Sequence, residues 1–230
     1  CCRGCSRTPT SSCGPAARCC ASTATAGSKP YTPGTGPGKW VPTPPANGDE
    51  NASGPMFFIA YGIVASALKR NDVYGLNLSG KIVVMLEGPP ANVEKNSWKR
   101  VRAQFEIVRS LVLAGVTGIV FINHGREEHP YAEIADYLTR RQLKLADGID
   151  YPAELPPFVR VSDEAADKLF AKSGTTRSEA LARAEAEGFK PIDLKQTSKI
   201  VIRYKKGKGT GSNVIGLMEG SDPNLKNEAV

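Results

Sequence analysis

The chain has two histidines, His124 and His129, which enclose two glutamates in the segment His124-Gly-Arg-Glu127-Glu128-His129. Imidazole and carboxylate groups are zinc ligands, so this segment is the first candidate for metal chemistry. Ligand pairs on a helix favour a spacing of four residues, whereas these histidines are five apart, and the nearby Gly and Pro favour a loop. We interpret the segment as an ordinary solvated loop, with metal binding as the alternative.

Cysteine thiolates are the other common zinc ligands. All six cysteines lie within the first twenty residues: Cys1, Cys2, Cys5, Cys13, Cys19 and Cys20. Only Cys2 and Cys5 have the Cys-x-x-Cys spacing, and no second pair or histidine lies nearby. We predict that residues 1–55 are a disordered, low-complexity leader rich in Cys, Pro and Gly. A small disulfide knot or metal knuckle is one alternative, and an out-of-frame reading of this stretch is another.

Other patterns that could carry chemistry are weak. The Gly-x-Ser-x-Gly turn that exposes a nucleophilic serine does not occur. Gly207-Lys-Gly-Thr-Gly211 lacks the Gly-Lys-Ser/Thr ending of a phosphate-binding loop, so we expect a hairpin or interdomain turn. Four basic residues could contact an acidic partner, or could simply keep one helix face solvated: Lys99, Arg100, Arg102 and Arg109. We therefore predict no catalytic, cofactor-binding or metal-binding residue in this chain.

Charge and hydropathy limit the partners. The net charge is +7, from 30 basic and 23 acidic residues, and the two signs are mixed along the chain. This pattern is typical of a solvated surface, so we predict no nucleic-acid partner. No run approaches the roughly 18 apolar residues of a membrane helix, so we predict no membrane span. A basic segment followed by an apolar run is also missing from the first residues, so we predict no signal peptide in this chain.

A strand–helix–strand unit is the clearest structural pattern. Residues 81–87 and 117–123 are continuous apolar runs, which is typical of strands buried on both faces. Residues 97–114 between them are predicted to be helical, with Ser97 as N-cap and Gly115 at the C-cap. The predicted apolar stripe of this helix consists of Val101, Phe105, Val108 and Val112. We expect two parallel strands joined by a helical crossover.

The remaining elements follow the same alternation. Strands are predicted at residues 57–64, 158–161, 197–205 and 213–218. Ser162 is expected to cap a helix, and Thr176-Arg-Ser-Glu179 has the pattern of a capping box that opens another. The apolar stripe of the helix after Ser162 is predicted to be Ala165, Ala166, Leu169 and Phe170. Residues 28–48, dominated by Pro and Gly, are predicted to be an extended linker.

Five segments in this order resemble the protease-associated (PA) domain of di-zinc aminopeptidases: FFIAYGIVAS, DVYGLNLSGKIVVMLEG, LAGVTGIVFIN, PPFVRVSDEAADKLFAKSG and FKPIDLKQTSKI. The later segment NVIGLMEGSDPNLKNE resembles the start of the peptidase body in that family. The resemblance implies an α/β (α+β) fold. Residues 56–195 would form the PA domain, a β-sandwich or barrel-like sheet with flanking helices. Residues 196–230 would hold the first strands of an α/β zinc-peptidase domain, which is truncated here.

The resemblance also implies a function. The parent would be an extracellular or periplasmic aminopeptidase that hydrolyses peptide bonds at N-termini with two zinc ions. In that family a His-x-Asp motif with the first zinc ligands follows the turn at Gly220-Ser-Asp-Pro223, and this sequence contains no such motif. We therefore expect the chain to be an inactive fragment that binds no zinc, with a peptide or protein substrate as partner. The alternative is a stand-alone PA-type module that binds peptides or proteins without catalysis.

Overall fold

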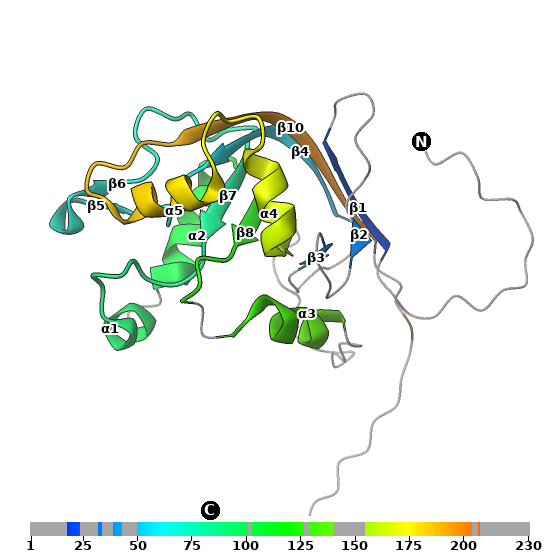
Figure 1. The fold of residues 1–230 in the computed structure, drawn as a ribbon, viewed down its shortest axis with the longest axis horizontal. Coiled ribbons are helices and arrows are strands. Elements are labelled where there is room, and N and C mark those ends of the chain that lie inside the picture. Colours follow the sequence, from blue (N-terminus) through cyan, green and yellow to red (C-terminus); the bar gives the residue numbers. More distant parts are fainter. Residues whose placement is uncertain are drawn as a thin grey trace, which may run out of the picture.

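The computed structural model describes residues 18–23, 32–33, 39–42, 50–100, 103–126, 129–139, 155–203 and 207. Within these ranges, strands form one eight-stranded sheet in the order β1-β10-β4-β7-β8-β9-β3-β2. A separate two-stranded sheet consists of β5 (Val64–Ala65) and β6 (Arg70–Asn71), which flank the 3-10 helix η1 (Ser66–Leu68). The described chain is therefore a mixed α/β structure in which helices pack on a curved sheet (Figure 1).

Four parallel strands form the centre of the sheet: β4 (Glu50–Phe58), β7 (Ile82–Leu86), β8 (Gly118–Ile122) and β9 (Phe158–Val161). The other four strands extend it on both sides: β10 (Ile192–Arg203), β1 (Arg18–Thr23), β3 (Lys39–Pro42) and β2 (Thr32–Pro33). Every residue of β7 and β8 is buried, as their continuous apolar runs predict. The predicted parallel crossover between these two strands is confirmed.

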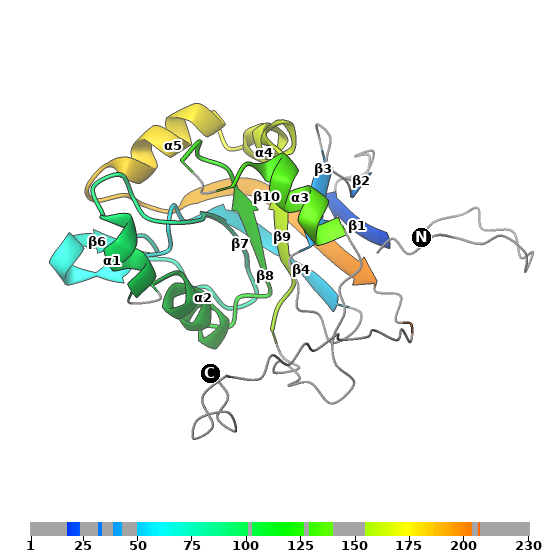
Figure 2. The same cartoon turned by 90° about the horizontal axis from the view of Figure 1, so that it is seen from below.

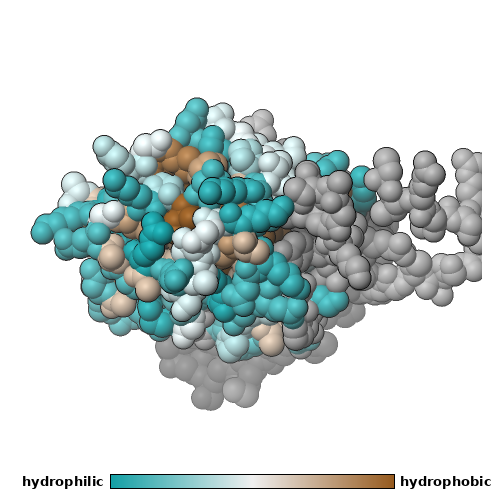
Figure 3. Space-filling view, turned by 45° about the horizontal axis from the view of Figure 1, so that its top comes forward, coloured by the Kyte–Doolittle hydropathy of each residue, from teal (hydrophilic) through white to brown (hydrophobic). Residues whose placement is uncertain are grey.

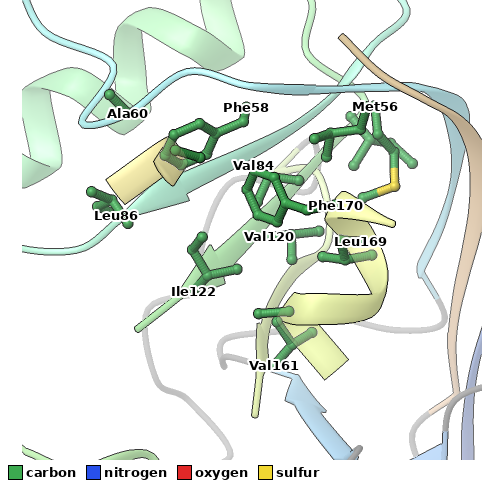
Figure 4. Close-up of a cluster of buried hydrophobic side chains, with 14 of the residues drawn as sticks. Met56, Phe58, Ala60, Val84, Leu86, Val120, Ile122, Val161, Leu169 and Phe170 are labelled. Atoms are coloured by element: carbon green, nitrogen blue, oxygen red, sulfur yellow. The ribbon is translucent and has the colours of Figure 1, made fainter. Parts of the chain in front are cut away.

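Helices cover both faces of the sheet. α1 (Lys95–Arg100) and α2 (Ala103–Leu113) lie on one side, and α4 (Asp163–Phe170) and α5 (Arg177–Glu185) lie on the other (Figure 2). Successive residues of β7 point to opposite faces of the sheet. Val84 belongs to the hydrophobic cluster that includes residues of α4 and α5, and Val83 belongs to the cluster that includes a residue of α2. Figure 4 shows the first cluster, in which Phe58 and Phe170 meet edge to face at 5.4 Å between ring centroids.

The helix caps predicted at Ser162 and Thr176 are confirmed, whereas Ser97 lies inside α1. The Ser162 hydroxyl accepts a hydrogen bond from the Ala165 backbone N–H at the start of α4. Thr176 and Glu179 form the reciprocal capping box that begins α5. The apolar stripe predicted for α4 is buried in full. A further helix, α3 (Tyr131–Thr139), follows β8.

The helix predicted at residues 97–114 starts elsewhere, and its predicted apolar stripe is only partly right, because Val108 packs against the core whereas Phe105 does not. α1 begins at Lys95, two residues before the expected cap, and α2 begins at Ala103. Phe105 was predicted to be in the apolar stripe, but its side chain is 53% exposed, whereas Leu111 is 3% exposed. Ile107 packs beside Leu111 against the sheet. Apolar residues form two overlapping stripes on this helix. The stripe that packs against the sheet is the one that includes Ile107 and Leu111, so the buried face is rotated from the predicted one.

Four strands lie wholly or partly where the sequence predicts a disordered leader and a linker: β1, β2, β3 and the start of β4. β3 pairs with β9, and its residues Trp40 and Val41 are fully buried. β4 begins at Glu50, five residues before the expected end of the leader at residue 55. The prediction of a linker over residues 28–48 is therefore wrong for β3, since the prolines around Trp40 still allow a short extended strand.

The last part of the described chain is one long strand. β10 pairs with β4 along its length, with a register shift between Asp193 and Thr197. The bulge includes Lys195, whose φ of 50° is left-handed. The domain boundary predicted after residue 195 falls inside this strand. The predicted strand at 213–218, the turn at 220–223 and the side chains of all six cysteines lie outside the described residues.

Candidate functional site

The loops that follow parallel strands meet at one edge of the sheet. Because β4, β7 and β8 run in the same direction, their carboxyl ends share that edge. In open α/β sheets, ligands characteristically bind outside these strand ends. The loops at residues 59–63, 87–94 and 123–126 follow β4, β7 and β8, respectively. The candidate site consists of polar groups on these three loops and at the end of α5.

The loop after β4 leaves the strand abruptly. The sequence predicts a strand to residue 64, but β4 ends at Phe58 because Ala60 and Gly62 have φ values of 47° and 69°. Left-handed backbone at a buried alanine costs free energy and must be held by its surroundings. The Asp72 carboxylate stabilises this left-handed turn. Its Oδ2 accepts hydrogen bonds from the backbone N–H groups of Tyr61 (3.2 Å) and Ile63 (3.0 Å).

A buried ion pair connects this loop to α5. Arg70 donates to Asp72 with Nε–Oδ1 at 3.1 Å, and the two side chains are only 5% and 1% exposed. The same guanidinium donates from Nη2 to the carbonyl oxygen of Ala184 at 2.7 Å and lies 5.4 Å from the centroid of the Tyr61 ring. Burial raises the pKa of Asp72, although Arg70 and the two backbone donors oppose that shift. The pair therefore fixes Tyr61 and the end of α5 relative to each other.

Glu185, the last residue of α5, is hydrogen-bonded to a residue on each of the three loops. Its Oε1 accepts hydrogen bonds from the Tyr61 hydroxyl and from Arg126 Nη2, each at 2.5 Å, and its Oε2 accepts from the Ala91 backbone N–H at 2.9 Å. Arg126 Nη2 also donates to the Tyr61 hydroxyl at 2.7 Å. Tyr61, Ala91 and Arg126 lie on the loops after β4, β7 and β8. We call Tyr61, Arg126 and Glu185 the strand-end cluster.

The electrostatics of the strand-end cluster keep its members in their ordinary charge states at neutral pH. Burial acts to raise the pKa of Glu185, but the hydrogen bonds from Tyr61, Ala91 and Arg126 together lower it. Burial, followed by the bond to Glu185, raises the pKa of the Tyr61 hydroxyl. The hydrogen bond to Glu185 also raises the pKa of Arg126. The result is a neutral phenol between a carboxylate and a guanidinium, which is suited to recognition by hydrogen bonds.

The two histidines of the sequence motif are bound to different partners. His124 Nε2 lies 2.6 Å from the carbonyl oxygen of Glu87, and its ring meets the Tyr61 ring at 5.9 Å between centroids. His129 Nδ1 lies 3.2 Å from the Glu133 carboxylate one turn into α3. Within the described ranges, His, Cys, Asp and Glu side chains do not gather in groups of three or more.

The other predicted candidates lie apart from the strand-end cluster. Lys99 is on α1 and Arg109 is on α2, where both are exposed, and Arg109 contacts Glu106 at 3.5 Å. The side chains of Arg100 and Arg102 lie outside the described residues, as does most of the segment 207–211. None of the helices within the described ranges is long and apolar enough to cross a membrane.

Sequence reasoning missed the members of the cluster. Tyr61 and Glu185 are 124 residues apart, and Arg126 and Glu185 are 59 apart, so no local motif connects them. Arg126 lies inside the segment singled out for its histidines, and its position after a predicted strand was the available signal.

Comparison with known proteins adds no relative to this picture: no protein-family model matches the chain, and no curated protein matches it.

Proposed function

We propose that this chain is the PA-type accessory part of a zinc-dependent aminopeptidase, in which it binds or admits peptide substrates. The zinc ligands would belong to the peptidase domain. The resemblance of the five ordered segments supports this proposal. The observation that carries the accessory role is the strand-end cluster, where three loops meet around groups that bind one another and hold no activated nucleophile.

The proposal assigns the chain no hydrolytic step. The Tyr61 hydroxyl is held as a neutral donor to Glu185, and the Glu185 carboxylate accepts three hydrogen bonds, so neither group is poised to attack or deprotonate a substrate. Both groups hold Arg126, whose partly exposed guanidinium suits the recognition of oxygen acceptors on a peptide. A peptide from the extracellular or periplasmic space is the substrate class that the family resemblance suggests.

A binding module that acts without a peptidase domain is the second candidate. The strand-end cluster favours it in one respect, because its hydrogen bonds all join residues within the segment 56–195. Both functions require that the chain bind peptides, and they differ in whether an aminopeptidase loses activity when this segment is removed.

Two assays on the purified chain test the proposal. We expect no release of arylamine from aminoacyl arylamides above the background of zinc alone, and less than one zinc per chain by metal analysis. We also expect saturable binding of short unblocked peptides. Robust turnover would contradict the accessory role, and a lack of peptide binding at millimolar concentration would contradict both candidate functions. In an aminopeptidase that carries this segment, deletion of residues 50–203, which removes β4 and β10 whole, should raise KM more than it lowers kcat.

A further inference from the structure

Arg126 uses only one of its three guanidinium nitrogens in the strand-end cluster. Both of its hydrogen bonds, to the Tyr61 hydroxyl and to Glu185 Oε1, come from Nη2. The N–H groups on Nε and Nη1 donate to no described residue, and the Arg126 side chain is 41% exposed. A guanidinium carries five N–H donors, so most of the donor capacity of Arg126 remains for a ligand.

Other arginines near this edge are used more completely. Arg70 donates from both Nε and Nη2, and Arg160 binds the Glu87 carboxylate from Nε at 3.0 Å and from Nη2 at 2.6 Å. Arg177 donates from Nε to Asp167 at 2.6 Å and from Nη1 to Asp163 at 3.4 Å. Arg177 shows that one guanidinium in this protein holds two carboxylates at the same time. Among the described residues, Arg126 has one carboxylate partner, Glu185.

The orientation of Arg126 is fixed before any ligand arrives. Tyr61 and Glu185 hold Nη2 from two sides, and Glu185 is anchored in turn by the Ala91 N–H. An arginine held in this way has already lost much of its rotamer freedom, so a ligand bound at Nε or Nη1 costs less entropy. Preorganised donors of this kind favour an anionic oxygen acceptor.

The proposed function indicates the kind of anion. Glu185 balances the charge of the Arg126 guanidinium, and the remaining N–H groups of Arg126 can still donate to an anionic oxygen. A peptide supplies such an oxygen as a carboxylate. In Figure 3 hydrophilic side chains predominate on the described part of the face, around a smaller hydrophobic patch.

We propose that the strand-end cluster binds a carboxylate group of a peptide through the N–H groups of Arg126 that Nη2 leaves available. This inference rests on the proposed function for its peptide ligand. The carboxylate is either the C-terminal group of the peptide or an acidic side chain, since both present the same chemistry to a guanidinium. Tyr61 and Glu185 act as positioning residues, because they hold Arg126 without needing to touch the peptide.

The test uses the complete chain and three N-acetylated hexapeptides of small residues. The first has a free C-terminal carboxylate, the second has a C-terminal amide, and the third has a C-terminal amide and one internal Glu. We expect calorimetric titration to give affinities for one or both acidic peptides that are at least about tenfold higher than that for the neutral amide. A preference confined to the first peptide identifies the C-terminal carboxylate, and an equal preference for the third identifies any peptide carboxylate.

Arg126→Gln should abolish the preference, so that all three peptides bind equally weakly, and Arg109→Gln is the matched control that should keep it. If Arg126→Gln fails to fold, Arg126→Lys decides the matter, because it keeps the charge but loses the fixed guanidinium donors and should lower the preference several-fold. Equal binding of all three peptides by the native chain, or an unchanged preference in the folded variant, would overturn the inference while leaving peptide binding intact. Failure of every peptide to bind would also overturn the proposed function.

Discussion

Glu185 occupies a position that ordinarily disfavours a carboxylate. It is the last residue of α5, and the C-terminal end of a helix carries partial negative charge. Three donors offset this cost: the Tyr61 hydroxyl, the Arg126 guanidinium and the Ala91 N–H. The negative charge of Glu185 is therefore stabilised by donors on the three loops and not by the helix to which it belongs.

Replacing Glu185 by Gln should lower the free energy of unfolding by about 1–2 kcal/mol, because a charged acceptor shared by three donors becomes neutral. Urea denaturation at pH 7 measures the change. Glu164→Gln is the control, since the exposed pair of Glu164 with Lys168 at 2.8 Å should be worth less than about 0.5 kcal/mol. Equal effects of the two substitutions would show that the Glu185 contacts add little to stability.

The residues of the strand-end cluster illustrate what sequence can and cannot predict. Each is ordinary in its local context, and their chemistry exists only because the sheet brings distant loops together. The histidine motif, in contrast, has the residue types of a metal site, but His124 and His129 face different partners in the fold. Spacing along the chain predicts proximity within one helix turn, and it does not predict which loops share an edge of the sheet.

At the scale of elements, α2 offers a direct comparison between pattern and packing. Leu111→Ala should cost about 2–4 kcal/mol, because it leaves a cavity against the sheet. Phe105→Ala, at a position that is 53% exposed, should cost less than about 1 kcal/mol. Chemical denaturation of both variants checks the ranking. A larger loss for Phe105→Ala would support the apolar stripe expected from sequence instead of the one in the structure.

Ser162 connects two elements as well as capping one. Its hydroxyl accepts from the backbone N–H groups of Ala165 in α4 and Lys39 in β3, the latter at 3.1 Å. Ser162→Ala should therefore cost about 1–2 kcal/mol, towards the upper end of the range for N-caps. Thr176→Ala, which removes a cap in an exposed capping box, should cost about 1 kcal/mol or less. Thermal unfolding of the two variants measures the difference.

The elements that could be predicted share a physical property. β7, β8, α4 and α5 have a continuous apolar run or a cap with clear chemistry, so local sequence alone specifies them. β3 could not be predicted, because Trp40 and Val41 stand among prolines and glycines and gain their burial only by pairing with β9. The loop after β4 could not be predicted either, because its left-handed turn at Ala60 depends on hydrogen bonds to Asp72, twelve residues further along the chain.

At the scale of the whole molecule, stability should depend on the ionisation of Glu50 at the start of β4. Burial raises the pKa of Glu50 from its usual value of 4.5 to about 7. Between these two values the folded protein keeps a proton that the unfolded chain releases, so stability falls as the pH rises through this window. In Glu50→Gln this contribution is missing.

We therefore expect the variant Glu50→Gln to gain stability relative to the native chain as the pH rises from 5 to 8. Urea denaturation across this pH range measures the difference between the two proteins. Glu164→Gln, which changes an exposed carboxylate, should show a nearly constant difference from the native chain over the same range. A constant difference for Glu50→Gln would mean that Glu50 titrates as it does in water.

The contact between Tyr61 and Glu185 also bears on how the protein folds. It joins residues 124 positions apart, and it requires β4, β7, β8 and α5 to be in place. Closing such a long loop is entropically costly, so contacts of this kind form after local structure. The strand-end cluster should therefore be absent from the folding transition state and appear only when the sheet is nearly complete. A chain that is misfolded or cut short within the described region would lack the cluster, so ligand binding there would be confined to correctly folded molecules.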